Sequence, residues 1–313
     1  MIRIVAVGGI LAAITFAFVK AREPVELGKV KWGRDLEAAL SASQENGKPV
    51  FALFQEVPGC AGCQQFGKEV LSHPQLIEVI ETEFVPVAIF NNQPGKDAEI
   101  LKQFGEPAWN YQVVRFLDGA AQDIIPRKDR VWTLEGIASR MIAALEAANR
   151  EVPNYLRALS GTAGIHNEGV AAFAMHCFWT GEQRLGGLDG VFTTEAGWLA
   201  GREVTLVRYD RDEVSLAELA KAAIQFTGAD QAFVGNGEDG VVAGKAGLKV
   251  SPLTEDYRVA RASDQKRQLR GTVFQKLNLS PIQATKVNAF ARTETNAAVA
   301  WLSPAQIKTL TSP

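Results

Sequence analysis

The sequence predicts an α/β protein with two globular domains. Its 313 residues are 47% hydrophobic, which is enough for two separate cores. Apolar runs with the length of buried strands alternate with segments of helical spacing. Proline, serine and glycine gather between residues 151 and 165, which predicts a domain boundary there. We expect the first domain to cover residues 25–150 and the second to cover residues 165–313.

The first residues have the pattern of a targeting segment. Arg3 precedes an uncharged run at residues 4–19, which is short for a membrane span but matches a signal h-region. Residues 19–21, Val-Lys-Ala, have the small-x-small pattern of a signal-peptidase site. We expect residues 1–21 to be a signal peptide or an uncleaved membrane anchor, and the protein to be exported (periplasmic) or membrane-anchored. The alternative is a buried N-terminal strand or helix.

Charge and composition exclude several classes of function. The chain has 33 basic and 35 acidic residues, spread along its length, so we expect no nucleic-acid surface. Its three histidines are scattered, which argues against a histidine-based metal site. The glycines at residues 235–247 do not follow the strand-helix phosphate pattern and are expected to form loops. We expect no cofactor.

The first domain shows a regular alternation of elements. Strands are predicted at residues 49–54, 84–90, 113–117 and 123–125, the last two forming a hairpin. Helices are predicted at residues 35–43, 64–71, 74–82, 96–104 and 133–149. This order predicts a sheet covered by helices.

Two cysteines lie at the first predicted junction of strand and helix. Cys60 and Cys63 are three positions apart at a helix start, where two thiols can close a disulfide. Cys60 is nearest the helix N-terminus, so we expect it to have the lower pKa and to attack, while Cys63 resolves. A structural disulfide is the alternative. A zinc site would need a second pair of Cys or His, and the sequence has none.

This arrangement resembles the thioredoxin fold. Residues 57–60, Val-Pro-Gly-Cys, are also similar to a thioredoxin-like group in which selenocysteine can occupy the first redox position. Two features depart from the thioredoxin pattern. Gly59 stands in place of the usual tryptophan, and Gln112 stands where the next strand begins instead of the family's cis-proline. Pro107 is the candidate for that proline.

In the second domain a third cysteine follows an apolar run. Residues 171–175 predict a buried strand, and Cys177 lies where the chain turns towards a helix at residues 180–185. A helix N-terminus favours the thiolate, and His176 could add positive charge. The alternative is an inert, buried cysteine. The other predicted elements are strands at residues 191–195 and 203–209, and helices at residues 215–226, 280–291 and 303–310.

Four segments of the second domain, in order, resemble the type A peptide methionine sulfoxide reductases. Each has a counterpart in that family: the active-site Cys-Phe-Trp, Pro-Gly-Val-x-x-Thr-x-x-Gly-Tyr, the strand that opens on an acidic proton donor, and Asp-x-x-x-Gln-Tyr-Arg. In this chain they are residues 171–182, 188–198, 203–210 and 264–270. The order of four segments is more specific than any one of them.

The resemblance implies roles for individual residues. Cys177 would attack the sulfoxide sulfur and Glu203 would donate the proton. The remaining candidates contact the substrate, with the aromatic pair lining a slot for the methyl group: Phe178, Trp179, Glu182 and Asp264. Glu182 is also a second candidate for the proton donor. Plain core packing is the alternative for the aromatics, and a solvated helix carboxylate is the alternative for Glu182.

The sequence also departs from the reductase family. Residues 198–202 are too short to carry the family's first substrate-binding tyrosine, and Leu269 stands at the position of the second. No cysteine follows Cys177, so we expect Cys60 and Cys63 to resolve its sulfenic acid.

The predicted function is therefore a thiol-disulfide oxidoreductase. We expect it to reduce methionine sulfoxide in proteins or peptides, as a peptide-methionine (S)-S-oxide reductase does, with an external thiol as reductant. An uncleaved N-terminal segment would add the membrane as a partner. The alternative is a thioredoxin-like protein whose degenerate, non-catalytic second domain binds partner proteins.

Overall fold

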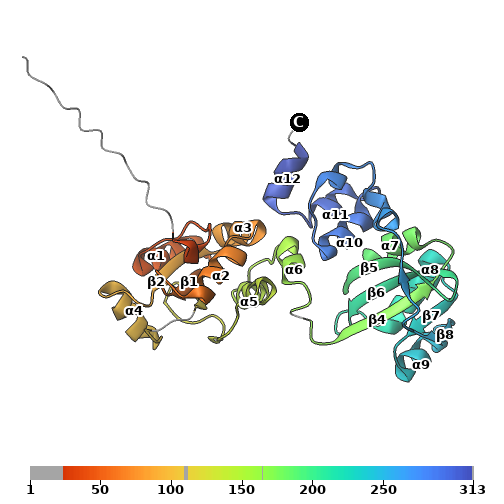
Figure 1. Ribbon diagram of the computed structural model, residues 1–313, viewed down its shortest axis with the longest axis horizontal. Helices are drawn as coiled ribbons and strands as arrows, with labels where there is room; N and C mark the ends of the chain where they lie inside the picture. The colour runs from red at the N-terminus through yellow and green to blue at the C-terminus, as the bar shows by residue number, and fades with distance from the viewer. Residues whose placement is uncertain (1–23, 109–111, 164, 312–313) are drawn as a thin grey trace, which may run out of the picture.

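The structure is a computed structural model that describes residues 24–108, 112–163 and 165–311 (Figure 1). The predicted signal peptide or anchor at residues 1–21 lies outside the described residues. Within those three ranges, none of the helices has the length and apolar composition needed to span a bilayer. The chain forms two sheets with helices packed on them, which confirms the predicted α/β class.

The first sheet has three strands in the order β2-β1-β3. The central strand β1 (Val50–Gln55) pairs in parallel with β2 (Val85–Phe90) and antiparallel with β3 (Val113–Leu117). The predicted strand at residues 123–125 forms only a single bridge between Leu117 and Asp123. Pro126 follows at once and has no N–H to continue the ladder.

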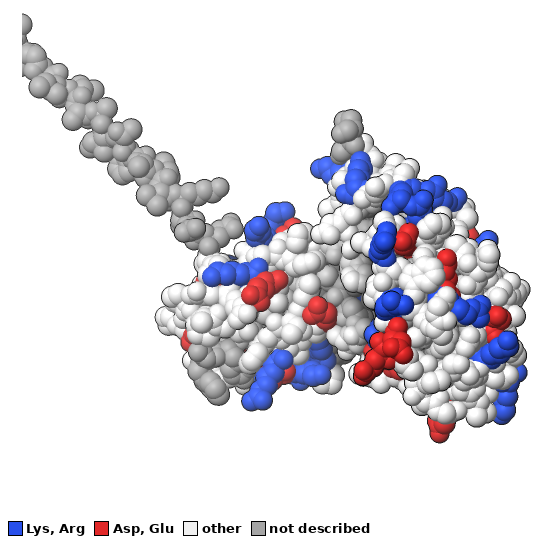
Figure 2. Space-filling view, turned by 45° about the vertical axis from the view of Figure 1, so that its right-hand side comes forward, with Lys and Arg blue, Asp and Glu red and all other residues white. Residues whose placement is uncertain are grey.

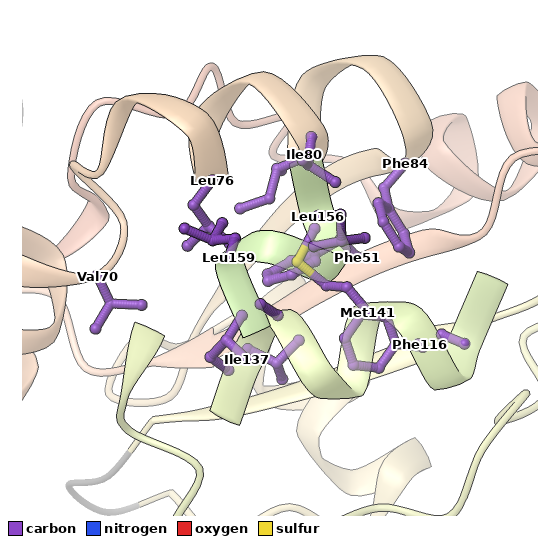
Figure 3. Packing of buried hydrophobic residues seen from close by; sticks show 14 of the residues in the cluster. Phe51, Val70, Leu76, Ile80, Phe84, Phe116, Ile137, Met141, Leu156 and Leu159 are labelled. Atoms are coloured by element: carbon purple, nitrogen blue, oxygen red, sulfur yellow. The ribbon is translucent and has the colours of Figure 1, made fainter. Parts of the chain in front are cut away.

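Six α-helices and a short 3-10 helix surround this sheet. They are η1 (Val25–Leu27), α1 (Leu36–Asn46), α2 (Ala61–Glu69), α3 (Pro74–Glu83), α4 (Lys96–Phe104), α5 (Leu134–Ala147) and α6 (Asn154–Ser160). All residues of β1 are buried because helices cover both faces of the sheet. Phe51 packs edge-on against Phe116 on one face, with ring centroids 5.4 Å apart, beside Met141 and Leu156 (Figure 3).

The second sheet has six strands in the order β8-β7-β4-β6-β5-β9. They are β4 (Glu168–Ala174), β5 (Val191–Leu199), β6 (Arg202–Asp210), β7 (Gln231–Val234), β8 (Lys249–Pro252) and β9 (Arg258–Val259). The α-helices are α7 (Phe178–Gly186), α8 (Leu216–Thr227), α9 (Gly237–Lys245), α10 (Pro281–Phe290), α11 (Thr295–Val299) and α12 (Pro304–Thr311). Three 3-10 helices follow β9: η2 (Ala262–Asp264), η3 (Arg267–Leu269) and η4 (Val273–Lys276).

The glycine-rich stretch at residues 235–247, predicted to form loops, contains α9. The Asn236 side chain caps this helix by accepting a 2.8 Å hydrogen bond from Asp239 N–H. Arg211 then holds the Asp239 carboxylate with two hydrogen bonds of 2.8 and 2.7 Å. A cap and a partly buried ion pair outweigh the low helix propensity of the glycines.

The two domains meet around α6. Leu156 and Leu159 of this helix belong to the core of the first domain, although they follow its predicted end at residue 150. Ala158 of the same helix packs against Phe192 and Ile282 of the second domain. Figure 1 shows α5 and α6 between the two sheets, and Figure 2 shows side chains of both charge signs on both domains.

Candidate active site

The two cysteines of the first domain lie together at the end of β1. Cys60 is the N-cap residue of α2, and its Sγ atom lies 3.6 Å from Cys63 Sγ. Cys60 is partly exposed, whereas Cys63 is fully buried. A Cβ atom at position 59 would lie only 2.7 Å from Cys63 Cβ, so this position accepts only glycine. The tryptophan that thioredoxins usually carry here would not fit.

The surroundings give the two thiols opposite acidities. A hydrogen bond from the Cys63 backbone lowers the pKa of Cys60, outweighing partial burial. Burial, followed by contact with Cys60, raises the pKa of Cys63 to about 12. This asymmetry suits attack by the exposed Cys60 and resolution by the buried Cys63.

Pro107 does not take the place of the cis-proline. Among the described residues, the cis peptide bond is Val57–Pro58, which precedes the dithiol in the chain. The residue that reaches the buried thiol is Gln112, directly before β3, whose Oε1 lies 3.7 Å from Cys63 Sγ.

Two glutamates beside the dithiol were not identified from the sequence. Glu56 directly follows β1, and its carboxylate lies with Cys60 Sγ and Cys63 Sγ in a group whose atoms are all within 4.8 Å of one another. Glu26 is buried, and its Oε1 accepts a 2.9 Å hydrogen bond from Gly59 N–H. Neither glutamate has a distinctive pattern in the sequence, because Glu56 is a single carboxylate after a strand and Glu26 lies far from the cysteines along the chain.

The third cysteine lies at the start of a helix in the second domain. Cys177 is the N-cap residue of α7 and is partly exposed. The next residue, Phe178, donates its backbone N–H to Glu203 Oε2 at 2.9 Å. Glu203 comes from β6, the neighbour of β4 in the sheet. The fold thus places a thiol and a carboxylate beside the same helix N-terminus.

Aromatic side chains surround this helix start. The Phe178 ring lies edge-on to Trp179 and Trp198, at centroid distances of 5.9 and 5.7 Å. The Trp179 indole N–H donates to the Asp264 carbonyl oxygen at 3.0 Å, and the Arg267 guanidinium lies 4.8 Å from the indole ring centre. Residues from all four segments that carry the reductase resemblance therefore meet at the start of α7.

Glu182 is buried in the second domain and paired with Lys266. Its side chain is fully buried, and Lys266 binds both carboxylate oxygens, through Nζ at 2.5 Å and the backbone N–H at 2.8 Å. Burial raises the pKa of Glu182, and the Lys266 charge opposes that shift. The structure contradicts the solvated-carboxylate alternative, because Glu182 is buried and joins α7 to the segment that carries Asp264. The roles in substrate contact and proton donation stay predictions.

No tyrosine takes the place of the missing substrate-binding tyrosines among the described residues near Phe178. Tyr257 donates its hydroxyl to Glu195 Oε1 at 2.7 Å and packs against Gly197. Side chains alternate along β5, so Tyr257 lies on the face opposite Trp198 and Phe178. Leu269 packs with the apolar cluster around Phe274.

The two thiol centres lie in different domains. Figure 1 shows α2 and α7 well separated, with α5 and α6 between them. Cys177 is not part of the group formed by Cys60, Cys63 and Glu56. The predicted transfer between Cys60 and Cys177 therefore needs an encounter of two chains or a domain movement.

Comparison with known proteins supports the assignment of the first domain. Residues 31–119, which contain β1, α2 and the dithiol, match a family described as thioredoxin-like. A comparison with curated proteins gave no match. The solved structure of a DsbH oxidoreductase is 18% identical, with a TM-score of 0.33, over 42% of this chain and 94% of that chain. The family match describes the first domain as thioredoxin-like, and the Cys60–Cys63 pair lies where α2 begins.

Proposed function

We propose that the protein is a thiol-disulfide oxidoreductase whose second domain reduces methionine sulfoxide in proteins or peptides. The proposal of methionine sulfoxide reduction rests on the hydrogen bond from Phe178 N–H to Glu203 beside Cys177. It supports the proposal because Cys177, the candidate nucleophile, and Glu203, the candidate proton donor, lie at one helix start with aromatic rings next to them. The thioredoxin-like fold of residues 31–119 supports the first part.

The dithiol would act by thiol-disulfide exchange. The Cys60 thiolate attacks a disulfide, which releases one thiol and leaves a mixed disulfide on Cys60. Cys63 then attacks Cys60 Sγ, 3.6 Å away, and releases the second thiol. An external thiol then reduces the Cys60–Cys63 disulfide by two further exchange steps and returns both cysteines to the thiol state.

The second domain would reduce the sulfoxide with Cys177. The Cys177 thiolate attacks the sulfoxide sulfur, and Glu203 protonates the oxygen that leaves the sulfur. The oxygen then passes to Cys177 Sγ as the bond between Cys177 and the methionine sulfur breaks, so the products are methionine and a sulfenic acid on Cys177. A thiol then condenses with the sulfenic acid, giving a disulfide and water, and a second thiol reduces that disulfide. Phe178, Trp179 and the 40% exposed Trp198 would contact the methyl group.

One observation favours a different function for the second domain. Two tyrosines of the reductase family are missing, and Leu269 packs into a core where the second hydroxyl would be needed. Loss of a hydrogen-bond donor to a developing oxyanion costs roughly 10²–10³ in rate. The competing proposal is that the domain binds partner proteins without catalysis.

A reductase assay separates these proposals. The purified full chain is supplied with dithiothreitol and with each epimer of a methionine sulfoxide peptide. We expect turnover of the S epimer, abolished by Cys177→Ser and retained with dithiothreitol when Cys60 and Cys63 are both replaced by serine. No turnover of either epimer would favour the binding module.

We also propose that the protein is exported or membrane-anchored through residues 1–21. The support is the apolar run at residues 4–19 with a small-x-small motif behind it. Cell fractionation tests this, and full-length protein in the soluble cytosol would contradict it.

A further inference from the structure

The thiols of the first domain share their turn with a carboxylate that thiol exchange does not use. One ligand atom from each of Glu56, Cys60 and Cys63 lies within 4.8 Å of the other two. Glu56 is the residue after β1, and Cys60 is the residue before α2. Glu56 and Cys60 therefore lie at the two ends of one short connection, and Cys63 lies in the first turn of the helix that follows.

We propose that Glu56 and the reduced dithiol bind a thiophilic divalent cation, with Zn²⁺ as the best match. A tetrahedral zinc ion with Zn–S bonds of about 2.3 Å separates two sulfur ligands by roughly 3.8 Å. The Sγ atoms of Cys60 and Cys63 are 3.6 Å apart, so they need almost no movement. Two thiolates with one oxygen ligand suit zinc better than magnesium or calcium, which prefer oxygen alone.

The fourth position is open to an oxygen ligand. Gln112 Oε1 lies 3.7 Å from Cys63 Sγ, a separation that neighbouring ligands of a tetrahedral ion can have. Either this amide oxygen or a water would complete the coordination. A site with three anionic ligands and an exchangeable fourth position binds metal reversibly, unlike a closed structural site.

The state of Glu56 supports a ligand role. No hydrogen bond or ion pair joins its partly buried carboxylate to the residues that the structure describes, whereas the nearby Glu26 accepts from Gly59 N–H. A bound cation would supply the missing counter-charge, because it stabilises the carboxylate and both thiolates together.

Metal binding and disulfide formation would exclude each other. Both use the sulfur atoms of Cys60 and Cys63, and a disulfide has no thiolate to offer a metal. Zinc would therefore hold the dithiol reduced and block its exchange reactions. The site is independent of the methionine sulfoxide chemistry proposed for Cys177, so either proposal can fail alone.

Cobalt spectroscopy on the full chain tests the site. Reduced, desalted protein is titrated with Co²⁺ without oxygen, and Zn²⁺ is then added. We expect a thiolate-to-cobalt charge-transfer band and the visible bands of tetrahedral Co²⁺, both removed by Zn²⁺. Cys177→Ser should keep these bands, which shows that the third cysteine is not the ligand. Protein with the Cys60–Cys63 disulfide should show none.

Single variants assign the ligands. Cys60→Ser and Cys63→Ser should each weaken Co²⁺ binding by more than about tenfold and reduce the charge-transfer band. Glu56→Gln should keep the charge-transfer band but weaken binding by about tenfold or more. Glu99→Gln, an exposed glutamate of α4, is the matched control and should bind as wild type.

Proton release gives a second readout that does not depend on colour. Metal binding must displace the thiol proton of the buried Cys63, so weakly buffered protein should acidify on Zn²⁺ addition, and Cys63→Ser should acidify less. Wild-type affinity in Cys60→Ser would overturn the site. Equal affinity of Glu56→Gln and wild type would overturn the role of the carboxylate.

Discussion

The backbone N–H of Phe178 donates a 2.9 Å hydrogen bond to Glu203 Oε2, which fixes a carboxylate beside the N-cap residue Cys177. Glutamine at position 203 would still accept this hydrogen bond but could not deliver a proton to a departing oxygen. We expect Glu203→Gln to fold normally and to lower kcat for methionine sulfoxide by about 10²–10⁴, the usual contribution of a general acid. Turnover of a sulfoxide peptide with dithiothreitol measures the effect.

Glu195 provides the matched control for this substitution. It lies on the neighbouring strand β5, with its carboxylate held by the Tyr257 hydroxyl on the opposite face of the sheet. Glu195→Gln should therefore cause no comparable loss of kcat. Equal activity of Glu203→Gln and wild type would rule out Glu203 as the proton donor.

The acidities of the dithiol predict different reactivities for its two cysteines. A backbone hydrogen bond from Cys63 lowers the pKa of Cys60, and this bond survives in Cys63→Ser. Burial raises the pKa of Cys63, and this cause survives in Cys60→Ser. A lowered pKa populates the thiolate at lower pH. The alkylation rate of Cys63→Ser should therefore rise at pH values below the ordinary pKa range of a thiol. The alkylation rate of Cys60→Ser should rise only at pH values above that range.

These rates must be measured without interference from the third thiol. Both variants are therefore prepared in a Cys177→Ser background, and the triple serine variant gives the baseline. Iodoacetamide labelling followed by mass spectrometry reports each rate constant against pH. If the two titrations have the same midpoint, the assignment of Cys60 as the attacking thiol is incorrect.

Features set by neighbouring residues could be predicted from the sequence. The spacing of Cys60 and Cys63 and the apolar run before them fix a strand, a turn and a helix start, all found in the structure. The sequence-based argument against a zinc site counted only Cys and His as ligands, so it left out the carboxylate of Glu56. Glu56 was overlooked because a single carboxylate after a strand has no distinctive pattern.

Features that depend on distant contacts could not be predicted. Glu182 and Lys266 are 84 residues apart in sequence, so no local pattern shows that the carboxylate is buried and paired. Likewise, Gln75 of α3 donates to Gln283 of α10, 208 residues later, and α6 packs on both domains. The helix α9 was missed because its Asn236 cap and its ion pair to Arg211 override the glycines.

The buried pair of Glu182 and Lys266 predicts a large effect on stability. Glu182 is fully buried and the Lys266 side chain is 16% exposed. Glu182→Gln leaves the ammonium group without its counter-charge, and breaking a buried pair in this way costs about 3–5 kcal/mol. We expect the free energy of unfolding to fall by this amount, measured by urea denaturation of the full chain.

An exposed ion pair in the same domain provides the comparison. Arg208 and Glu168 are 2.7 Å apart, with side chains 48% and 37% exposed. Glu168→Gln should cost at most about 1 kcal/mol because water screens this pair. Joint replacement of Glu182 by Leu and Lys266 by Met should recover much of the lost stability. If Glu182→Gln unfolds like Glu168→Gln, the buried pair contributes no more than a surface pair.

The positions of the thiols determine how a sulfenic acid on Cys177 can be resolved. Its domain contains no other cysteine, and the only remaining thiols in the sequence are Cys60 and Cys63. These lie in the other domain, beyond α5 and α6 (Figure 1). Capture of Cys177 by Cys60 is therefore expected between two chains, unless the domains move apart and rearrange.

Replacing Cys63 by serine should trap this transfer. The Cys60 thiol condenses with the Cys177 sulfenic acid, releasing water, and the resulting disulfide persists because Cys63 is no longer there to attack it. We expect Cys63→Ser protein treated with a methionine sulfoxide peptide to accumulate a covalent dimer linked through Cys60 and Cys177, detected by non-reducing peptide mapping and formed more slowly on dilution. A link whose rate is independent of concentration would instead show transfer within one chain. If only oxidised Cys177 accumulates, the two domains are not redox partners, and an external thiol must reduce the second domain.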